Sequence, residues 1–166
     1  MTSFKGKLLL LVFSTLMVTV TTAADERRTD PDKLVSYIMP LEWNNTHFAN
    51  GRHFQRADNP ANKAILAVVP EVRDEYMTLE QTRSGRSRVH EIQGRKQVYS
   101  AVKQINEFEV WEAIWEANIR GDDVIMHDFM MFSDTRLVEV HLIASTVDYP
   151  EFLPDLRKVV ASMRVN

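Results

Sequence analysis

The hydrophobic and polar positions between residues 108 and 145 predict three consecutive β-strands. In residues 108–119 apolar and polar side chains alternate, which is typical of a strand with one buried face. Residues 124–132 and 137–145 are rich in Val, Ile, Phe and Met, and turn-forming residues separate the three segments. The pattern therefore predicts an antiparallel meander.

The register of this meander decides which side chains share a face. We expect a three-residue loop at 121–123, which places Trp115 opposite Phe129, because a two-residue loop would mix apolar and polar side chains on each face. A second turn then places Phe129 against Val140. The predicted core face holds Trp111, Trp115, Phe129, Met131, Val138, Val140 and Leu142. The predicted polar face holds Glu116, Met126, Asp128, Met130, Glu139 and His141.

Two helices are predicted outside the meander. Thr78 and Gln81 have the spacing of a capping box that opens a helix over residues 79–88. A second helix begins at Pro150, and its apolar residues recur at helical spacing. These residues are Phe152, Leu153, Leu156, Val159, Val160 and Met163. Such a stripe must pack on a sheet.

The remaining segments complete an α+β fold in which helices pack on an antiparallel sheet. Further strands are predicted at 34–41, 53–57, 63–69 and 98–105, whereas residues 44–52 have the composition of a loop. Residues 25–33 are polar and are expected to form a flexible lead-in to one globular domain over residues 34–166.

The first 24 residues have the composition of a secretory signal peptide. Lys5 and Lys7 precede an apolar run over residues 8–20, and the small residues Ala23 and Ala24 follow it. The run is shorter than the roughly 20 residues that a spanning helix needs. We expect cleavage after Ala23 or Ala24, a periplasmic or secreted location, and no stable membrane span in the mature protein. An uncleaved membrane anchor is the alternative.

Charge and cysteine content exclude several classes of function. Residues 1–24 contain two basic and no acidic residues, which leaves 18 basic and 23 acidic residues and a formal charge of −5 for the mature chain. This charge argues against nucleic acid as the main partner. The chain has no cysteine, so thiol chemistry and cysteine-based metal sites are excluded. We predict no cofactor and no dedicated metal site.

Several short segments occur in a characteristic order. Segment 37–43, at the end of the first predicted strand, carries Pro40 followed by Trp43, and segments 59–69, 94–104 and 129–145 come next. A closing helix ends in the residues Ala161-Ser162-Met163-Arg164. In this order the chain resembles the PsbP/Mog1/DcrB-like domains over most of residues 34–165. The resemblance implies a mostly non-enzymatic role, as an accessory subunit, a chaperone-like adaptor or an exported protein, and it supplies no catalytic residues.

Three polar residues of the predicted meander form a candidate catalytic row. The predicted register places Glu116, Asp128 and His141 side by side on adjacent strands. Two carboxylates beside an imidazole can bind a divalent metal or orient a general base, as in a small metal-assisted hydrolase. The alternative is an ordinary solvent-facing side of an antiparallel sheet. His127, on the predicted core face, is expected to be buried and hydrogen-bonded.

Five basic residues are concentrated near the middle helix of this acidic chain. They are Arg83, Arg86, Arg88, Arg95 and Lys96. A positive patch on a negative domain can steer a partner protein that has an acidic surface, although a solvated helix face explains the same residues. We predict an exported, non-enzymatic binding or adaptor protein. An immunity protein against a secreted toxin is one concrete form of it, and the metal-assisted hydrolase is the alternative.

The first testable prediction concerns export. In its native host the protein should begin at Ala24 or Asp25, because signal peptidase cleaves after small residues. Mass spectrometry of the purified protein measures this N-terminus. An intact Met1 in the bulk of the protein would contradict the prediction.

Overall fold

The computed structural model describes residues 25–48, 51–58, 61–74 and 76–166. Within these residues the strands are β1 (Glu26–Thr29), β2 (Val35–Met39), β3 (Asn44–Phe48), β4 (Gly51–Asp58), β5 (Ala61–Val72), β6 (Lys96–Ile105), β7 (Phe108–Ile119), β8 (Asp122–Phe132), β9 (Arg136–Ser145) and β10 (Arg164–Val165). The helices are α1 (Leu79–Ile92) and α2 (Tyr149–Ser162). The predicted signal peptide over residues 1–24 lies outside the described residues. Neither α1 nor α2 is long and apolar enough to cross a membrane.

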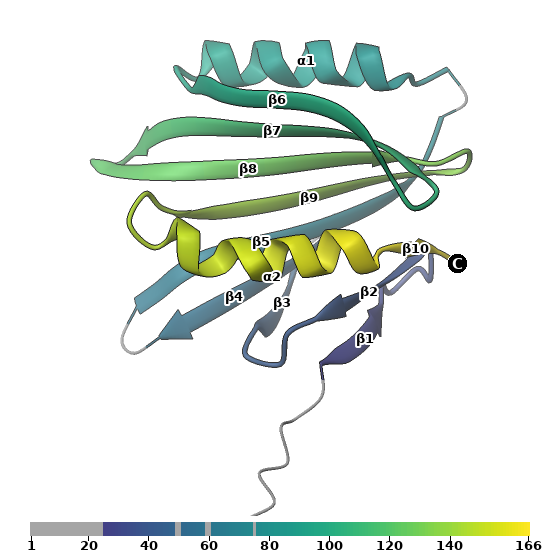
Figure 1. The fold of residues 1–166 in the computed structure, drawn as a ribbon, viewed down its shortest axis with the longest axis horizontal. Helices are drawn as coiled ribbons and strands as arrows, with labels where there is room; N and C mark the ends of the chain where they lie inside the picture. The colour runs from purple at the N-terminus through teal and green to yellow at the C-terminus, as the bar shows by residue number, and fades with distance from the viewer. Residues whose placement is uncertain (1–24, 49–50, 59–60, 75) are drawn as a thin grey trace, which may run out of the picture.

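The described strands form two antiparallel sheets that stack with the helices in layers (Figure 1). The large sheet has seven strands in the order β3-β4-β5-β9-β8-β7-β6, and the small sheet has three in the order β1-β2-β10. α2 packs against β2, β5 and β9, whereas α1 packs against β7 and β8. The two helices contact alternate residues of the meander and therefore cover opposite faces of the large sheet. This architecture confirms the predicted α+β fold.

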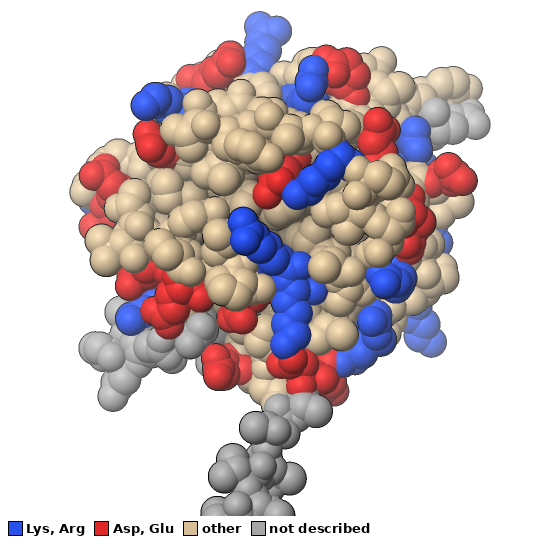
Figure 2. All heavy atoms as spheres, viewed as in Figure 1, with Lys and Arg blue, Asp and Glu red and all other residues tan. Residues whose placement is uncertain are grey.

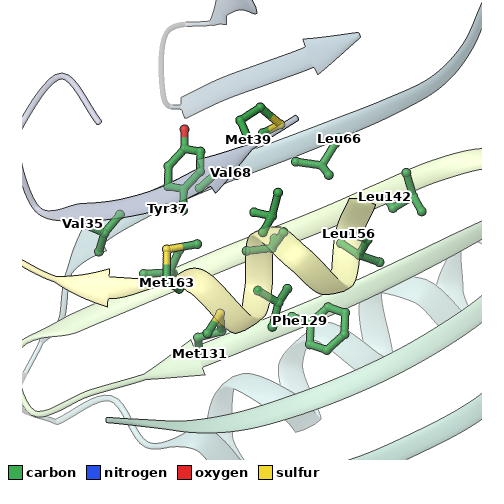
Figure 3. Close-up of a cluster of buried hydrophobic side chains, with 14 of the residues drawn as sticks. Val35, Tyr37, Met39, Leu66, Val68, Phe129, Met131, Leu142, Leu156 and Met163 are labelled. Atoms are coloured by element: carbon green, nitrogen blue, oxygen red, sulfur yellow. The ribbon is translucent and has the colours of Figure 1, made fainter. Parts of the chain in front are cut away.

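The larger hydrophobic core lies between α2, the small sheet and one face of the large sheet (Figure 3). Phe129 and Met131 of β8 and Leu142 of β9 meet Leu156 of α2 and Met163, which directly follows α2, and all five are at most 1% exposed. Residues Val35, Tyr37 and Met39 of β2 and Leu66 and Val68 of β5 complete this cluster. The predicted apolar stripe of the C-terminal helix is therefore its buried face.

The turn between β7 and β8 differs from the predicted three-residue loop. Ile119 pairs directly with Asp122, so the turn consists of Arg120 and Gly121 alone. Both turn residues have positive φ, 57° for Arg120 and 97° for Gly121. This is the backbone of a type I′ turn, whose twist matches that of the flanking strands. The prediction was wrong because it assumed that one face of the meander stays polar, whereas both faces pack against core residues. The observed turn also requires the positive φ of Arg120, which a non-glycine residue seldom adopts.

The shorter turn moves the two tryptophans of β7 to the other face of the sheet. Trp111 and Trp115 pair with methionines of β8, whereas Phe129 faces α2 with its partner Val140. The predicted core face is therefore wrong for the tryptophans, and the predicted pairing of Phe129 with Val140 is confirmed. The tryptophans form a second core with Leu79 under α1. Both faces of the meander are consequently buried.

Two segments that we predicted to be irregular are strands. β1 lies in the predicted flexible lead-in and pairs with β2, and the Asp30 carboxylate accepts hydrogen bonds from the backbone of Asp32 and Val35 to close the intervening turn. β3 lies in the predicted loop and pairs with β4. Their polar sequences gave no periodic signal, because strand formation there depends on backbone pairing with a neighbour.

The predicted capping box of α1 is confirmed. The Thr78 hydroxyl accepts a hydrogen bond from the backbone of Gln81, and the Gln81 side chain accepts one from the backbone of Thr78, each at 3.2 Å. These bonds satisfy two amide groups that have no partner within the helix. The helix continues to Ile92, about one turn beyond the predicted end.

A truncation in α2 tests the larger core. Leu156→Ala should lower the free energy of unfolding by about 2–5 kcal/mol, because it leaves a cavity in a fully buried site. Arg157→Ala, at the next and exposed position, should change it by less than about 0.5 kcal/mol. Urea unfolding measures both values. Equal effects would show that α2 does not pack through this face.

Candidate functional site

Six polar side chains meet between α1 and the large sheet. α1 contributes two of them, one turn apart, and the segment that follows α1 contributes a third. The others come from β8 and β9, where Asp128 and His141 are direct cross-strand partners. We call this group the α1 cluster, and it consists of Arg86, His90, Arg95, Asp128, Glu139 and His141.

His141 lies at the centre of the α1 cluster with both ring nitrogens engaged. Its Nδ1 is 2.8 Å from Oδ1 of Asp128, and its Nε2 is 2.9 Å from Oε2 of Glu139. Burial by itself lowers the pKa of His141, but the hydrogen bonds and charges of Asp128 and Glu139 outweigh burial and raise the pKa to about 9. His141 is therefore an imidazolium at neutral pH, donating one hydrogen bond to each carboxylate.

His90 is the neutral histidine of the same cluster. Its ring stacks on Trp115 with centroids 4.3 Å apart, and Nη1 of Arg95 lies 2.9 Å from Nδ1 of His90. Burial lowers the pKa of His90 to about 4, although the Asp128 carboxylate acts in the opposite direction. Because Arg95 can only donate, Nδ1 of His90 accepts and its proton lies on Nε2. That nitrogen faces Oδ2 of Asp128 at 3.3 Å, but without the alignment of a hydrogen bond.

Arg86 joins the exposed side of α1 to the buried cluster. Its guanidinium contacts both carboxylate oxygens of Glu139, whose side chain is 15% exposed. Burial raises the pKa of Glu139, but the hydrogen bond of His141 and the charge of Arg86 outweigh it and hold the pKa below its usual range. Glu139 therefore carries a full negative charge between two cations, which ties α1 to β9.

Three of the four imidazole nitrogens of the α1 cluster are engaged within the cluster, whereas Oδ2 of Asp128 accepts no hydrogen bond from the described residues. Both nitrogens of His141 and Nδ1 of His90 are engaged, so none of them can accept a proton from a substrate or bind a metal. The described residues contain no group of three or more His, Cys, Asp or Glu that could hold a metal ion. The arrangement attaches α1 to the sheet and borders a cavity of about 280 Å³.

The predicted row of Glu116, Asp128 and His141 is not formed. Asp128 and His141 meet, but Asp128 pairs with Ala113 across β7, and Glu116 pairs with Ile125 on the opposite face of the sheet. Glu116 is exposed there, 3.5 Å from Lys96. The row failed because its register rested on the three-residue loop. The alternative of a solvent-facing side is also wrong, because α1 covers Asp128.

The basic residues near α1 do not form one free patch. Arg86 and Arg95 point into the α1 cluster, and Arg83 lies 2.8 Å from Glu80 on the helix surface. Lys96 faces Glu116. Arg88 is exposed and, among the described residues, has no ion pair. The predicted docking role of these residues stays a prediction, with Arg88 as the uncompensated charge.

Sequence reasoning missed His90 and separated residues that act together. Arg86 and His90 are four positions apart and so share one side of α1, and Leu79 lies eleven positions before His90 on that side. This spacing was the available signal that His90 faces the sheet. In contrast, the prediction that His127 is buried and hydrogen-bonded is confirmed, at 1% exposure.

The chain matches known proteins in three-dimensional structure but not in sequence. No family model and no curated protein sequence matches the chain. Solved structures do match. A protein of Bacteroides thetaiotaomicron aligns with a TM-score of 0.66 and 9% identity over 86% of this chain and 48% of its own. This chain thus spans about half the length of the Bacteroides protein.

Two smaller proteins match along almost their whole length. The cyanobacterial PsbP protein of Synechocystis aligns with a TM-score of 0.64 and 11% identity, covering 89% of this chain and 96% of its own. LpqN of Mycobacterium tuberculosis, described as involved in cell envelope biogenesis, aligns with a TM-score of 0.65 and 6% identity, covering 86% and 91%. The chain therefore has a PsbP/Mog1-like fold, as its sequence resemblance implied. At such identities the likeness establishes the fold alone.

The two histidines of the α1 cluster predict a stability maximum near neutral pH. The folded pKa of His141, about 9, is above its ordinary value of 6.5, so its contribution is complete below pH 6.5 and is lost as pH rises to 9. The folded pKa of His90, about 4, is below 6.5, so its contribution is complete above pH 6.5 and is lost as pH falls to 4. The free energy of unfolding should therefore fall on an acid limb, from pH 6.5 to 4, and on an alkaline limb, from pH 6.5 to 9. Each limb should have a slope of about 1.4 kcal/mol per pH unit, measured by urea unfolding.

Single substitutions separate the two limbs. His141→Gln should abolish the loss of stability between pH 6.5 and 9 and keep the acid limb. His90→Gln should abolish the loss of stability between pH 6.5 and 4 and keep the alkaline limb. Acidic side chains titrate below the alkaline window, so that window reports His141. An alkaline slope that is unchanged in His141→Gln would contradict the assignment.

Proposed function

We propose that this protein is an exported accessory protein that binds a partner protein through the outer side of α1 and the edge strand β6. The surface consists of Arg88, Val89, Ile92, Val98 and Val102, and we call it the α1–β6 surface. α1 and β6 are consecutive elements, joined by a short turn (Figure 1). The observation that carries the proposal is the exposure of apolar side chains on this surface.

The apolar residues of the α1–β6 surface are exposed although both cores of the domain are complete. Ile92 and Val89 of α1 are 76% and 46% exposed, and Val102 and Val98 of β6 are 48% and 44% exposed. Val102 pairs with Trp111, so it stands on the face of the sheet that α1 covers. Exposed apolar side chains on two consecutive elements are candidates for a protein–protein interface.

β6 offers backbone groups as well as side chains. It lies at the edge of the large sheet with β7 as its neighbour, and its ten residues are almost all exposed. An edge strand presents unpaired amide and carbonyl groups to which an extended segment of a partner can add. The register shift between Gln97 and Tyr99 limits this pairing at one end. Residues 99–105 therefore form the regular part of the edge.

Charge would select the partner. Arg88 is the exposed cation of the α1–β6 surface, and Arg83 stands at 38% side-chain exposure on the same helix. The mature chain is otherwise acidic by formal charge. A partner with an acidic segment would be attracted to α1 and repelled elsewhere, which raises the association rate and the selectivity.

Export is supported by the predicted signal peptide and agrees with one structural neighbour. LpqN, described as involved in cell envelope biogenesis, has the same fold. The register of β7 against β8 favours binding over the alternative metal-assisted hydrolase, because it splits the predicted catalytic row between two faces of the sheet. If the partner is a secreted toxin, the protein would act as an immunity protein.

A capture experiment tests the proposed function. The protein with a C-terminal tag, expressed in its native host, should retain one partner from the envelope fraction in near-stoichiometric amount. Arg88→Glu/Ile92→Glu should reduce capture at least about tenfold, because it reverses the free charge and places a second carboxylate in the apolar contact. Capture by the wild-type protein should weaken as salt rises.

A matched variant separates docking from general charge effects. Arg120→Glu/Val147→Glu makes equivalent changes, one reversed charge and one apolar residue replaced by Glu, at exposed positions outside the α1–β6 surface, where Val147 is 85% exposed. This variant should capture the partner as the wild type does. Both variants should melt within a few degrees of the wild type, since all four positions are exposed. Absence of any partner, or equal capture by the two variants, would refute the proposal.

A further inference from the structure

A cavity of about 600 Å³ lies on the face of the sheet opposite α1. α2 forms one wall with Leu153 and Val160, and Phe129 of β8 belongs to the floor. Figure 2 views the molecule from the side that carries α2 and shows basic side chains gathered near the centre of this face, beside a hollow. We call the cavity the α2 groove. Its size is that of a small-molecule site, typically about 300–1,000 Å³.

A chain of hydrogen bonds runs along the floor of the α2 groove. Oε1 of Glu112 lies 2.8 Å from Nε2 of His127, and Nδ1 of His127 lies 2.9 Å from the Tyr149 hydroxyl. We assign the Nε2 proton of His127 to the Glu112 carboxylate, so the Tyr149 hydroxyl donates to Nδ1. The Tyr149 oxygen can still accept a hydrogen bond through its lone pairs. His127 and Glu112, the other members of the chain, already have hydrogen-bond partners.

Glu112 is neutralised within this chain. Nζ of Lys103 lies 2.6 Å from Oε2 of Glu112, and the Glu112 side chain is 10% exposed. Burial raises the pKa of Glu112, but the hydrogen bonds of His127 and Lys103 outweigh burial and lower the pKa to about 2. The carboxylate therefore does not repel an anion in the α2 groove as a free carboxylate would.

Arg157 is the cation of the groove that the protein leaves uncommitted. It is exposed on α2 and lines the cavity, and among the described residues its guanidinium has neither an ion pair nor a hydrogen bond. Its charge acts on the Tyr149 hydroxyl, where it opposes the rise in pKa that burial causes. Lys103, at 40% side-chain exposure, also borders the groove. Two cations against one carboxylate leave the lining with one formal positive charge in excess.

We propose that the α2 groove binds a small organic carboxylate with an aromatic or branched apolar body. Arg157 and Lys103 hold the carboxylate, and Arg157 can do so with two parallel hydrogen bonds. The apolar body lies against Phe129, Leu153 and Val160. A single negative charge matches the single excess positive charge of the lining. This site lies on the face of the sheet opposite α1, and β6 contributes Tyr99, Lys103 and Ile105 to its lining. The proposal is argued from the groove alone and does not rest on the proposed partner.

A matched pair of probes tests the charge requirement. 1-Naphthylacetate carries a carboxylate on an aromatic body, and 1-naphthaleneacetamide is its neutral isostere. Isothermal titration calorimetry with the full protein should show 1-naphthylacetate binding at one site and the amide binding at least about tenfold more weakly. No heat with either probe, or equal affinity for both, would overturn the proposal.

Three variants locate the binding. Arg157→Gln should weaken 1-naphthylacetate about tenfold and leave the amide unchanged, because it removes the charge and keeps a polar side chain of similar length. Ala161→Trp should abolish binding of both probes, because Ala161 is an exposed residue of the groove wall and the indole would fill the cavity. Lys158→Gln removes the neighbouring positive charge of α2, which contacts Asp25 outside the groove, and should leave binding unchanged.

The controls also distinguish binding from misfolding and from general attraction. Circular dichroism and thermal melting should give wild-type curves for the three variants, because the substituted positions are all exposed. Equal weakening by Arg157→Gln and Lys158→Gln would show attraction to net positive charge, and it would refute the site. Undiminished binding in folded Ala161→Trp would place the probe elsewhere and would refute it as well.

Discussion

The β7–β8–β9 meander is packed on both faces, by α2 and the small sheet on one side and by α1 on the other. A sheet buried in this way has no solvent-facing side on which polar residues can stay hydrated. Each buried polar group must then find a partner within the protein, because an unpaired charge in the interior is strongly unfavourable. Asp128 and Glu139 meet this requirement through His141, and Glu112 meets it through Lys103 and His127.

The same constraint explains why the two faces of the meander differ in chemistry. Under α1 both carboxylates of the α1 cluster are paired with the His141 ring, and the guanidinium of Arg86 pairs with Glu139 as well. Beside α2 the paired groups lie on the floor of a cavity, and the guanidinium of Arg157 is left without a partner among the described residues. One face therefore uses its charges to attach a helix, whereas the other carries a cation that has no ion pair among the described residues.

The candidate binding surfaces follow from the positions of these elements. α1 is held by its inner side, which leaves Ile92 and Val89 on its outer side without contacts in a core. β6 ends the sheet, so its backbone and the exposed Val102 remain open to a partner. In this chain the edge strand β6 and the outer side of α1 are therefore exposed, and a cavity of about 600 Å³ lies on the face that α2 borders.

The sequence by itself determined the strands of the meander, both helices, the capping box of α1 and the buried stripe of α2. Each of these depends on residues that are neighbours along the chain, either through alternation, through helical spacing or through local hydrogen bonds. The pairing of Phe129 with Val140 was also accessible, because a short turn joins β8 to β9. Only the tertiary structure decided the rest. The positive φ of Arg120 set the register of β7 against β8, and the docking of α1 brought His90 and Arg86 to Asp128 and Glu139. Neither feature produces a repeating hydrophobic pattern in the sequence. The first is a backbone conformation that a residue of this type rarely adopts, and the second consists of contacts between segments about 40–50 residues apart.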